Sequence, residues 1–194
     1  MLTTERLVLR HWSDEDIAPV TAMFAAPAVM RYFLGTRDAA YSEKWVAGVR
    51  AHFDRTGFGI WAVEAPGVAP FIGFAGLSTV PDTMPACPGV EIVWTLAEAH
   101  WRRGYATEAA RAALADGFGR LGLDEIVAFT AAINAPSRGV MAKIGMQRDE
   151  RRDFLHPRIP MGHELSPHVL YRVAANPAPT RPSAPAAQGI ETKS

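Results

Sequence analysis

WRRGYATEA, residues 101–109, joins a strand-like run to a helix-like run. At such a junction the backbone N–H groups of the first helical turn lack partners within the helix, and they lie at the positive end of the helix dipole. Both features suit a phosphate group. Gly104 allows the backbone to approach an anion closely, and Arg102 and Arg103 add two positive charges. The stretch therefore predicts a cradle for a diphosphate.

The stretch is not a Walker loop, because no Gly-Lys-Ser/Thr follows it. It is not a dinucleotide-binding fingerprint either, because the second and third glycines of that motif are missing. A basic loop that simply enters an amphipathic helix remains the alternative. The flanking pattern favours a ligand site. An alternating strand precedes the loop at 90–96, and apolar residues recur at helical spacing from Ala106 to Leu121, in a helix that Gly122 is expected to end. A second strand at 126–130 then leads to a helix that Asn134 opens.

The order of these segments resembles the acetyl-CoA-binding core of the GNAT superfamily of N-acetyltransferases. The nearest branch is the RimJ/RimL type, which acetylates N-terminal amines of ribosomal proteins. Three runs carry the resemblance, namely Thr4–Arg10, Trp101–Ala109 and Asn134–Met146. Trp101 departs from the superfamily, which usually has Gln or Arg at the start of this loop, and an aromatic residue there is frequent in the RimJ/RimL branch.

The resemblance implies a single α/β domain over residues 1–173, with a mixed, mostly antiparallel twisted sheet that splays at the acyl-CoA site between flanking helices. It also implies acetyl-CoA as co-substrate, no metal, and direct transfer of the acetyl group to a primary amine of a protein N-terminus or a small molecule. The alternative is a CoA-binding sensor or interaction domain that has the fold but no turnover. Residues 174–194 are rich in Pro and Ala and predict a disordered tail.

In the resembled family the pantetheine arm of the donor pairs with the strand before the phosphate loop. Trp94 and Leu96 are thus expected to contribute main-chain contacts, and Val93 or Trp94 an N–H group for the thioester oxygen. The full set of predicted cofactor-binding residues is Val93, Trp94, Leu96, Arg102, Arg103, Gly104, Tyr105, Ala106, Thr107 and Asn134.

Glu91 is the predicted general base. It is the only carboxylate on its strand and has the apolar neighbours Val90 and Ile92, so partial loss of water is expected to raise its pKa toward a useful range. A carboxylate on an exposed strand face, or one paired with an arginine, is the alternative. No nucleophile is expected, because the chain has no Gly-x-Ser-x-Gly sequence and Cys87 has no neighbour that would lower its pKa.

Ser137 is the predicted acid that protonates the leaving thiolate, a role implied by the resemblance. Asn134 and Ser137 lie three residues apart at a helix start and face the same way. Asn134 is also a good N-cap, and Ser137 can merely satisfy a backbone donor. Tyr171 on the last strand is a weaker candidate for the acid.

Composition and residue spacing limit which further ligands and partners are expected. The 194 residues carry a formal net charge of zero, which gives no reason to expect nucleic acid or a membrane surface, and a single cysteine fits a reducing, cytoplasmic setting. A homodimer is left open. His156, His163 and His168 belong either to the acceptor pocket or to a surface loop, and their spacing does not match a metal site. Ser13 and Ser42 are expected to cap the first two helices.

Overall fold

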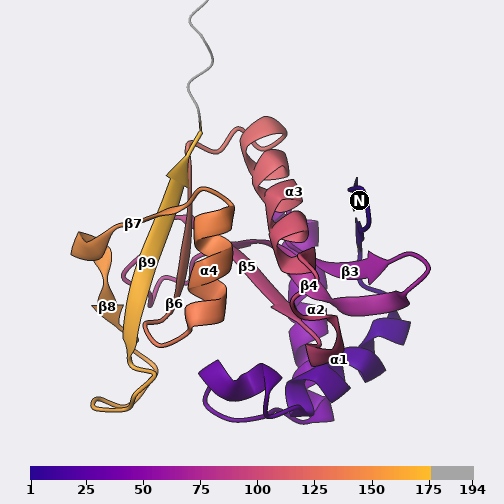
Figure 1. Ribbon diagram of the computed structural model, residues 1–194, viewed down its shortest axis with the longest axis horizontal. Helices are drawn as coiled ribbons and strands as arrows, with labels where there is room; N and C mark the ends of the chain where they lie inside the picture. The colour runs from indigo at the N-terminus through magenta and orange to yellow at the C-terminus, as the bar shows by residue number, and fades with distance from the viewer. Residues whose placement is uncertain (176–194) are drawn as a thin grey trace, which may run out of the picture.

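The computed structural model describes residues 1–175, whose nine strands form one continuous sheet in the order β1-β2-β3-β4-β5-β6-β9-β7, with β8 paired to β9 (Figure 1). The strands are β1 (Leu2–Thr3), β2 (Val8–Arg10), β3 (Ile60–Ala65), β4 (Ala69–Thr79), β5 (Val90–Leu96), β6 (Glu125–Ala131), β7 (Gln147–Arg148), β8 (Phe154–Leu155) and β9 (Pro167–Ala174). The predicted last strand therefore extends to Ala174, and the rest of the predicted tail, from residue 176, lies outside the described residues.

Helices follow the predicted order, with short 3₁₀ turns between them. The α-helices are α1 (Ile17–Ala25), α2 (Ala39–Thr56), α3 (Tyr105–Gly119) and α4 (Ala135–Lys143), and the 3₁₀ turns are η1 (Asp14–Asp16), η2 (Val29–Tyr32), η3 (Glu98–His100) and η4 (Glu150–Arg152). Across the described residues no helix is long and apolar enough to cross a membrane.

The two faces of the sheet carry different helices (Figure 1). On one face Phe74 of β4 packs against Phe24 of α1 and Trp45 of α2, with ring centroids 6.0 Å and 4.7 Å apart. On the other face α3 lies so close that a Cβ at Gly117 would come within 2.9 Å of Leu77. Side chains of successive strand residues alternate between these faces, so the parity of a position decides which helices it meets.

The central strands diverge after a single contact. β5 pairs with β4 in antiparallel register along its whole length, from Val90 to Leu96. On its other side β5 pairs with β6 in parallel at one position only, Glu91 with Val127, while β6 continues to pair with β9. Figure 1 shows β6 and β9 leaning away from β5. The expected mostly antiparallel sheet, splayed next to β5, is confirmed.

Two expectations about helix ends were wrong. α2 begins at Ala39 with Asp38 as its N-cap, because the Asp38 side chain accepts a hydrogen bond from the Tyr41 N–H at 2.8 Å. Ser42 instead lies buried one turn inside the helix, where its hydroxyl donates to the Asp38 carbonyl. α3 ends at Gly119, three residues before Gly122.

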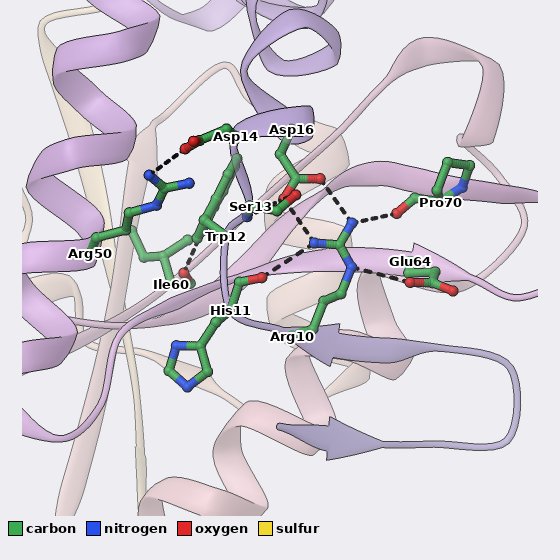
Figure 2. A network of polar contacts seen from close by, with 10 residues as sticks. All are labelled: Arg10, His11, Trp12, Ser13, Asp14, Asp16, Arg50, Ile60, Glu64 and Pro70. Carbon is green, nitrogen blue, oxygen red and sulfur yellow. Dashed lines mark hydrogen bonds and ion pairs between the residues drawn. The ribbon is translucent and has the colours of Figure 1, made fainter.

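The first helix is fixed to the sheet by a network around Arg10 (Figure 2). Its guanidinium donates two hydrogen bonds of 2.8 Å to the Asp16 carboxylate and further ones to Glu64 and the Pro70 carbonyl. Asp16 is 2% exposed and also accepts from the Ser13 backbone N–H at 2.8 Å, as part of the predicted cap. Although burial alone would raise the pKa of Asp16, the hydrogen bonds from Arg10 and Ser13 hold it below its ordinary value.

Removing the Asp16 carboxylate is expected to destabilise the protein strongly. In Asp16→Ala the Arg10 charge loses its buried partner, so the free energy of unfolding measured in urea should fall by about 2–4 kcal/mol. The matched control is Asp14→Ala, which breaks the ion pair of Asp14 with Arg50 in the same network, where the Asp14 side chain is 86% exposed. It should cost less than about 1 kcal/mol. Equal losses in the two variants would contradict this role for Asp16.

Candidate active site

The predicted phosphate loop ends where α3 begins. Gly104 is the N-cap of α3 and has φ +84°, a left-handed conformation that favours glycine. No described side chain caps the helix, so the N–H groups of Tyr105, Ala106 and Thr107 have no partner among the described residues. These amides lie at the positive end of a fifteen-residue helix, where an anion is favoured.

The N-terminal segment of the chain is attached to this loop. Glu108, in the first turn of α3, accepts hydrogen bonds from the Thr4 hydroxyl at 2.6 Å and from the Arg6 backbone N–H at 2.9 Å, and it forms an ion pair with the Arg6 guanidinium at 2.6 Å. Arg6 also donates to the Arg103 carbonyl at 3.0 Å. Burial alone would raise the pKa of Glu108, but these bonds hold it below its ordinary value. The negative charge of Glu108 is thereby paired with Arg6 of the N-terminal segment.

The side chains of the loop point to different places. Arg102 and Arg103 are exposed, and Arg102 takes φ +60°, which is uncommon for a residue other than glycine. The Tyr105 ring is 7% exposed and lies in the core, so of this predicted contact only the backbone N–H is available to a ligand. Ala106 and Thr107 are half-buried.

Strand β5 directs unpaired backbone groups toward β6. At its ends Ala97 N–H donates to the Ile72 carbonyl at 2.9 Å and Val80 N–H donates to the Gly89 carbonyl at 3.0 Å, which fixes the alternation of the antiparallel ladder. By this alternation one set of β5 residues bonds to β4 through the backbone, and the other set directs its N–H and C=O groups toward the diverging β6. The second set is Val90, Ile92, Trp94 and Leu96.

This register separates two predicted donors. Val93 is opposite Gly76 at a hydrogen-bonded position, so its N–H is used by the sheet and is not available to a thioester oxygen. Trp94 N–H lies beyond the single contact of β5 with β6 and remains free of both strands. Leu96 directs its carbonyl the same way, but that oxygen accepts the Trp101 indole N–H at 2.7 Å. Trp101 therefore ties the start of the phosphate loop back to β5, a contact that sequence reasoning missed.

Glu91 lies at the point where the strands separate. Its register partners are Ser78 on β4 and Val127 on β6, and the three side chains share the face on which α1 and α2 pack. Burial raises the pKa of Glu91 to about 7, and the charge of Arg158 opposes the shift only partly. Within the described residues Glu91 has no ion pair or hydrogen bond. The alternative of a carboxylate paired with an arginine is therefore not what the structure contains.

Ser137 lies near the start of α4, on the face of the sheet that is opposite to the Glu91 side chain. α4 packs through Met141 against Ala128, which alternates with the Glu91 partner Val127 along β6. Asn134 is the N-cap of α4, because its side-chain oxygen accepts the Ser137 N–H at 3.2 Å while its amide group donates to the Thr130 hydroxyl at 2.9 Å. The Ser137 hydroxyl has no partner among the described residues.

The remaining candidates fall into separate groups. Tyr171 packs against the apolar cluster beneath α3 and α4. His156 and His168 come together, with ring centroids 4.8 Å apart, and burial lowers the pKa of both. His163 is exposed and accepts from the Leu165 N–H. Burial and the Asp82 carboxylate raise the pKa of Cys87, as expected of a cysteine that is not a nucleophile. No set of three or more His, Cys, Asp or Glu side chains in residues 1–175 is placed to hold a metal ion.

Comparison with known proteins identifies the family. Residues 6–147 match the family model described as an acetyltransferase (GNAT) domain. The chain belongs to the GNAT acetyltransferase family. It is 34% identical over 146 residues to the uncharacterized protein YkkB of Bacillus subtilis, a match that covers 75% of this chain and 84% of the relative. As a member of this family the GNAT chain is an N-acetyltransferase.

Solved structures agree with this assignment. A GNAT-family acetyltransferase from Bacillus anthracis superposes with a TM-score of 0.73 at 27% identity, over 89% of this chain and 97% of that one. The ribosomal L7/L12 acetyltransferase RimL, in complex with coenzyme A, reaches a TM-score of 0.71 at 15% identity, over 89% of this chain and 96% of that one. At that identity the likeness concerns the fold alone, so the RimJ/RimL branch stays a prediction.

The GNAT family uses acetyl-CoA, and the residues of this chain fit that donor. The uncapped first turn of α3 offers N–H groups for the diphosphate, and a Cβ at Gly104 would lie 3.3 Å from the Arg6 guanidinium, so that Arg6 would have to shift slightly. The free groups of Trp94 suit an amide-bearing arm that extends along β5. The predicted phosphate loop is joined to β5 by the hydrogen bond from the Trp101 indole to the Leu96 carbonyl.

Replacing Glu91 is expected to change how stability depends on pH. The folded state binds the Glu91 proton more tightly than the unfolded state, whose pKa is near 4.5, so stability is lost as pH rises from about 4.5 through about 7. Glu91→Gln should therefore raise the free energy of unfolding at pH 8 by about 1–3 kcal/mol and change it little at pH 5.

Urea denaturation at the two pH values measures this difference. Glu15→Gln is the matched control, because Glu15 is exposed and has no hydrogen bond or ion pair within residues 1–175. It should leave the difference between pH 5 and pH 8 unchanged. A Glu91→Gln protein that keeps the wild-type pH dependence would contradict the raised pKa.

Proposed function

We propose that this chain transfers an acetyl group from acetyl-CoA to a primary amine by direct attack, without an acyl-enzyme. The observation that carries the proposal is the position of Glu91 where β5 leaves β6. This carboxylate, with its pKa of about 7, lies one contact away from the free backbone groups of β5. Bound acetyl-CoA would supply an activated acetyl thioester.

The residues that hold the donor follow from the geometry. The N–H groups of Tyr105, Ala106 and Thr107 would bind the diphosphate, with Arg102 and Arg103 adding charge at its edge. Backbone groups of Trp94, the Leu96 N–H and one remaining hydrogen of the Asn134 amide would hold the pantetheine arm. The Trp94 N–H is also directed to where it could donate to the carbonyl oxygen as negative charge develops there.

Glu91 would remove a proton from the amine, directly or through a water molecule. A carboxylate with a pKa near 7 is half ionised at neutral pH and is a stronger base than an exposed glutamate. An α-amino group has an ordinary pKa of about 8 and a lysine of about 10.4. A larger fraction of an N-terminal amine is therefore already neutral, and its acetylation depends less on a base such as Glu91. Ser137, on the other side of the diverging strands, would return a proton to the departing sulfur.

Turnover tests the proposal. Release of free CoA is followed with acetyl-CoA and a set of amines, and kcat/KM should rise with pH through about 7 as Glu91 loses its proton. Glu91→Gln should lower kcat/KM by about 10²–10⁴-fold and remove that rise. Glu15→Gln should keep both. A Glu91→Gln enzyme with the wild-type rate and pH profile would exclude Glu91 as the base, and no turnover with any amine would favour a CoA-binding sensor.

Donor binding gives a further prediction, at Gly104. Acetyl-CoA at about a hundred times its Kd should add about 2.7 kcal/mol to the stability of the protein, seen as a rise of several degrees in Tm. Gly104→Glu places bulk and negative charge at the diphosphate, which should weaken binding by about a hundredfold or more. Gly67→Glu is the control, since Gly67 has a similar φ of +77° in the β3–β4 turn. An unchanged Kd in Gly104→Glu would refute the cradle.

A further inference from the structure

An open groove of about 490 Å³ runs along α2 and includes Ser78, the residue of β4 that lies opposite Glu91. One stripe of α2 forms one wall, and Ile60 of β3 and Ser78 of β4 lie opposite. Ser78 and Glu91 are register partners on the same face of the sheet, where paired side chains start about 5 Å apart. The Ser78 end of the groove is therefore next to the proposed base in the sheet, and a molecule whose amine lies at Glu91 could extend past Ser78 into the groove.

The charged groups of the groove are all cationic. Lys44 and Arg55 line it, and none of the lining residues, all within the described part of the chain, is Asp or Glu. Neither Lys44 nor Arg55 forms an ion pair within residues 1–175, whereas Arg50, on another side of α2, pairs with Asp14. Two uncompensated positive charges in a groove attract an anionic ligand and repel a polyamine.

His52 does not add to this charge. It lines the groove between Lys44 and Arg55, and its two ring nitrogens contact the Phe58 carbonyl at 2.9 Å and the Thr79 backbone N–H at 3.3 Å. A nitrogen that accepts from an N–H group carries no proton, so this arrangement fixes the neutral ring. Burial, and then Arg55, lower the pKa of His52, in agreement with a neutral side chain.

The length of the groove points to an extended ligand. Lys44 and Arg55 are eleven residues apart on one helix, which corresponds to about 16 Å. A single amino acid cannot contact both, whereas four or five residues of extended chain, at about 3.3 Å each, can. Between the two cations the wall is apolar, with Trp45 and Val49.

We propose, on the basis of the proposed transferase function, that the acceptor is the N-terminal segment of an acidic peptide. The α-amine lies at Glu91, and carboxylates on the following residues reach Arg55 and Lys44 along α2. The spacing of Lys44 and Arg55 favours a peptide over a small amine. Because none of the lining residues within 1–175 is Asp or Glu, an acidic chain is favoured over a cationic one. Ser78 connects the groove to Glu91 through the register of β4 with β5.

Binding of three hexapeptides tests this inference. They share a free α-amine, a C-terminal dye and one sequence, except for Glu, Gln or Lys at positions two and six, which are about 13 Å apart in an extended chain. Fluorescence anisotropy gives their Kd in the presence of CoA. The Glu peptide should bind about tenfold more tightly than the Gln peptide, and the Lys peptide most weakly. The double variant Lys44→Glu with Arg55→Glu should reverse this order. Arg151→Glu, at an exposed position in η4, changes charge elsewhere and should preserve it.

The outcomes separate the two proposals. Equal binding of the three peptides, or an order unaffected by the double variant, would overturn the acidic acceptor, provided that acetyl-CoA still raises the Tm of the variant as in the wild type. Displacement of the Glu peptide by free glutamate at comparable concentration would overturn the peptide in particular. Tight binding of the Glu peptide with no CoA release from any amine would support the groove and refute the transferase.

Discussion

The contact between Glu91 and Val127 is the constraint on which the site depends. Within residues 1–175 it is the only position at which β5 pairs with β6 through the backbone, so it joins the two halves of the sheet and also determines where they separate. Beyond it Trp94 has no strand partner on the β6 side, although β5 keeps its full antiparallel ladder with β4. Unpaired backbone groups within a sheet are costly when buried, and a ligand with amide groups satisfies them. The position of the proposed base and the unpaired side of β5 that would hold the donor thus both result from the point at which β5 and β6 separate.

The same divergence places different chemistry on the two faces. Glu91 lies on the face of α1 and α2, next to a groove lined by cations, while Ser137 begins a helix on the face of α3. An amine can approach from one side and a thiolate can receive its proton on the other, so base and acid need no contact with each other. Trp101 couples the two regions, since its indole N–H binds β5 and its backbone starts the phosphate loop.

The order of the main helices and strands could be predicted from the sequence, because it depends on local pattern, whereas the splayed sheet was implied by the family resemblance. The start of α3 at Gly104 also followed from local pattern, and its role as a phosphate loop stays a prediction. The choice between Val93 and Trp94 as donor required the register with β4, which depends on where the β4–β5 connection places Gly76. Ser42 has the residue type of a cap, but Asp38 begins the helix one turn earlier and takes that role. The α2 groove was also missed, since its walls come from segments that meet only when the chain folds. Strands as short as β1, β7 and β8 contain too few residues for an alternating pattern.

The attachment of Thr4 and Arg6 to Glu108 has a consequence for how the molecule folds. These hydrogen bonds join residues 104 and 102 positions apart, so they enclose more than half of the chain in one loop. Contacts of such sequence separation carry a large closure entropy and slow the search for the native topology. Thr4 and Arg6 can make these native hydrogen bonds only when the first turn of α3 has formed, since Glu108 belongs to that turn. Loss of the first six residues would remove the hydrogen bonds that Glu108 accepts and the one that the Arg103 carbonyl accepts, next to the first turn of α3 and about a hundred residues away along the chain.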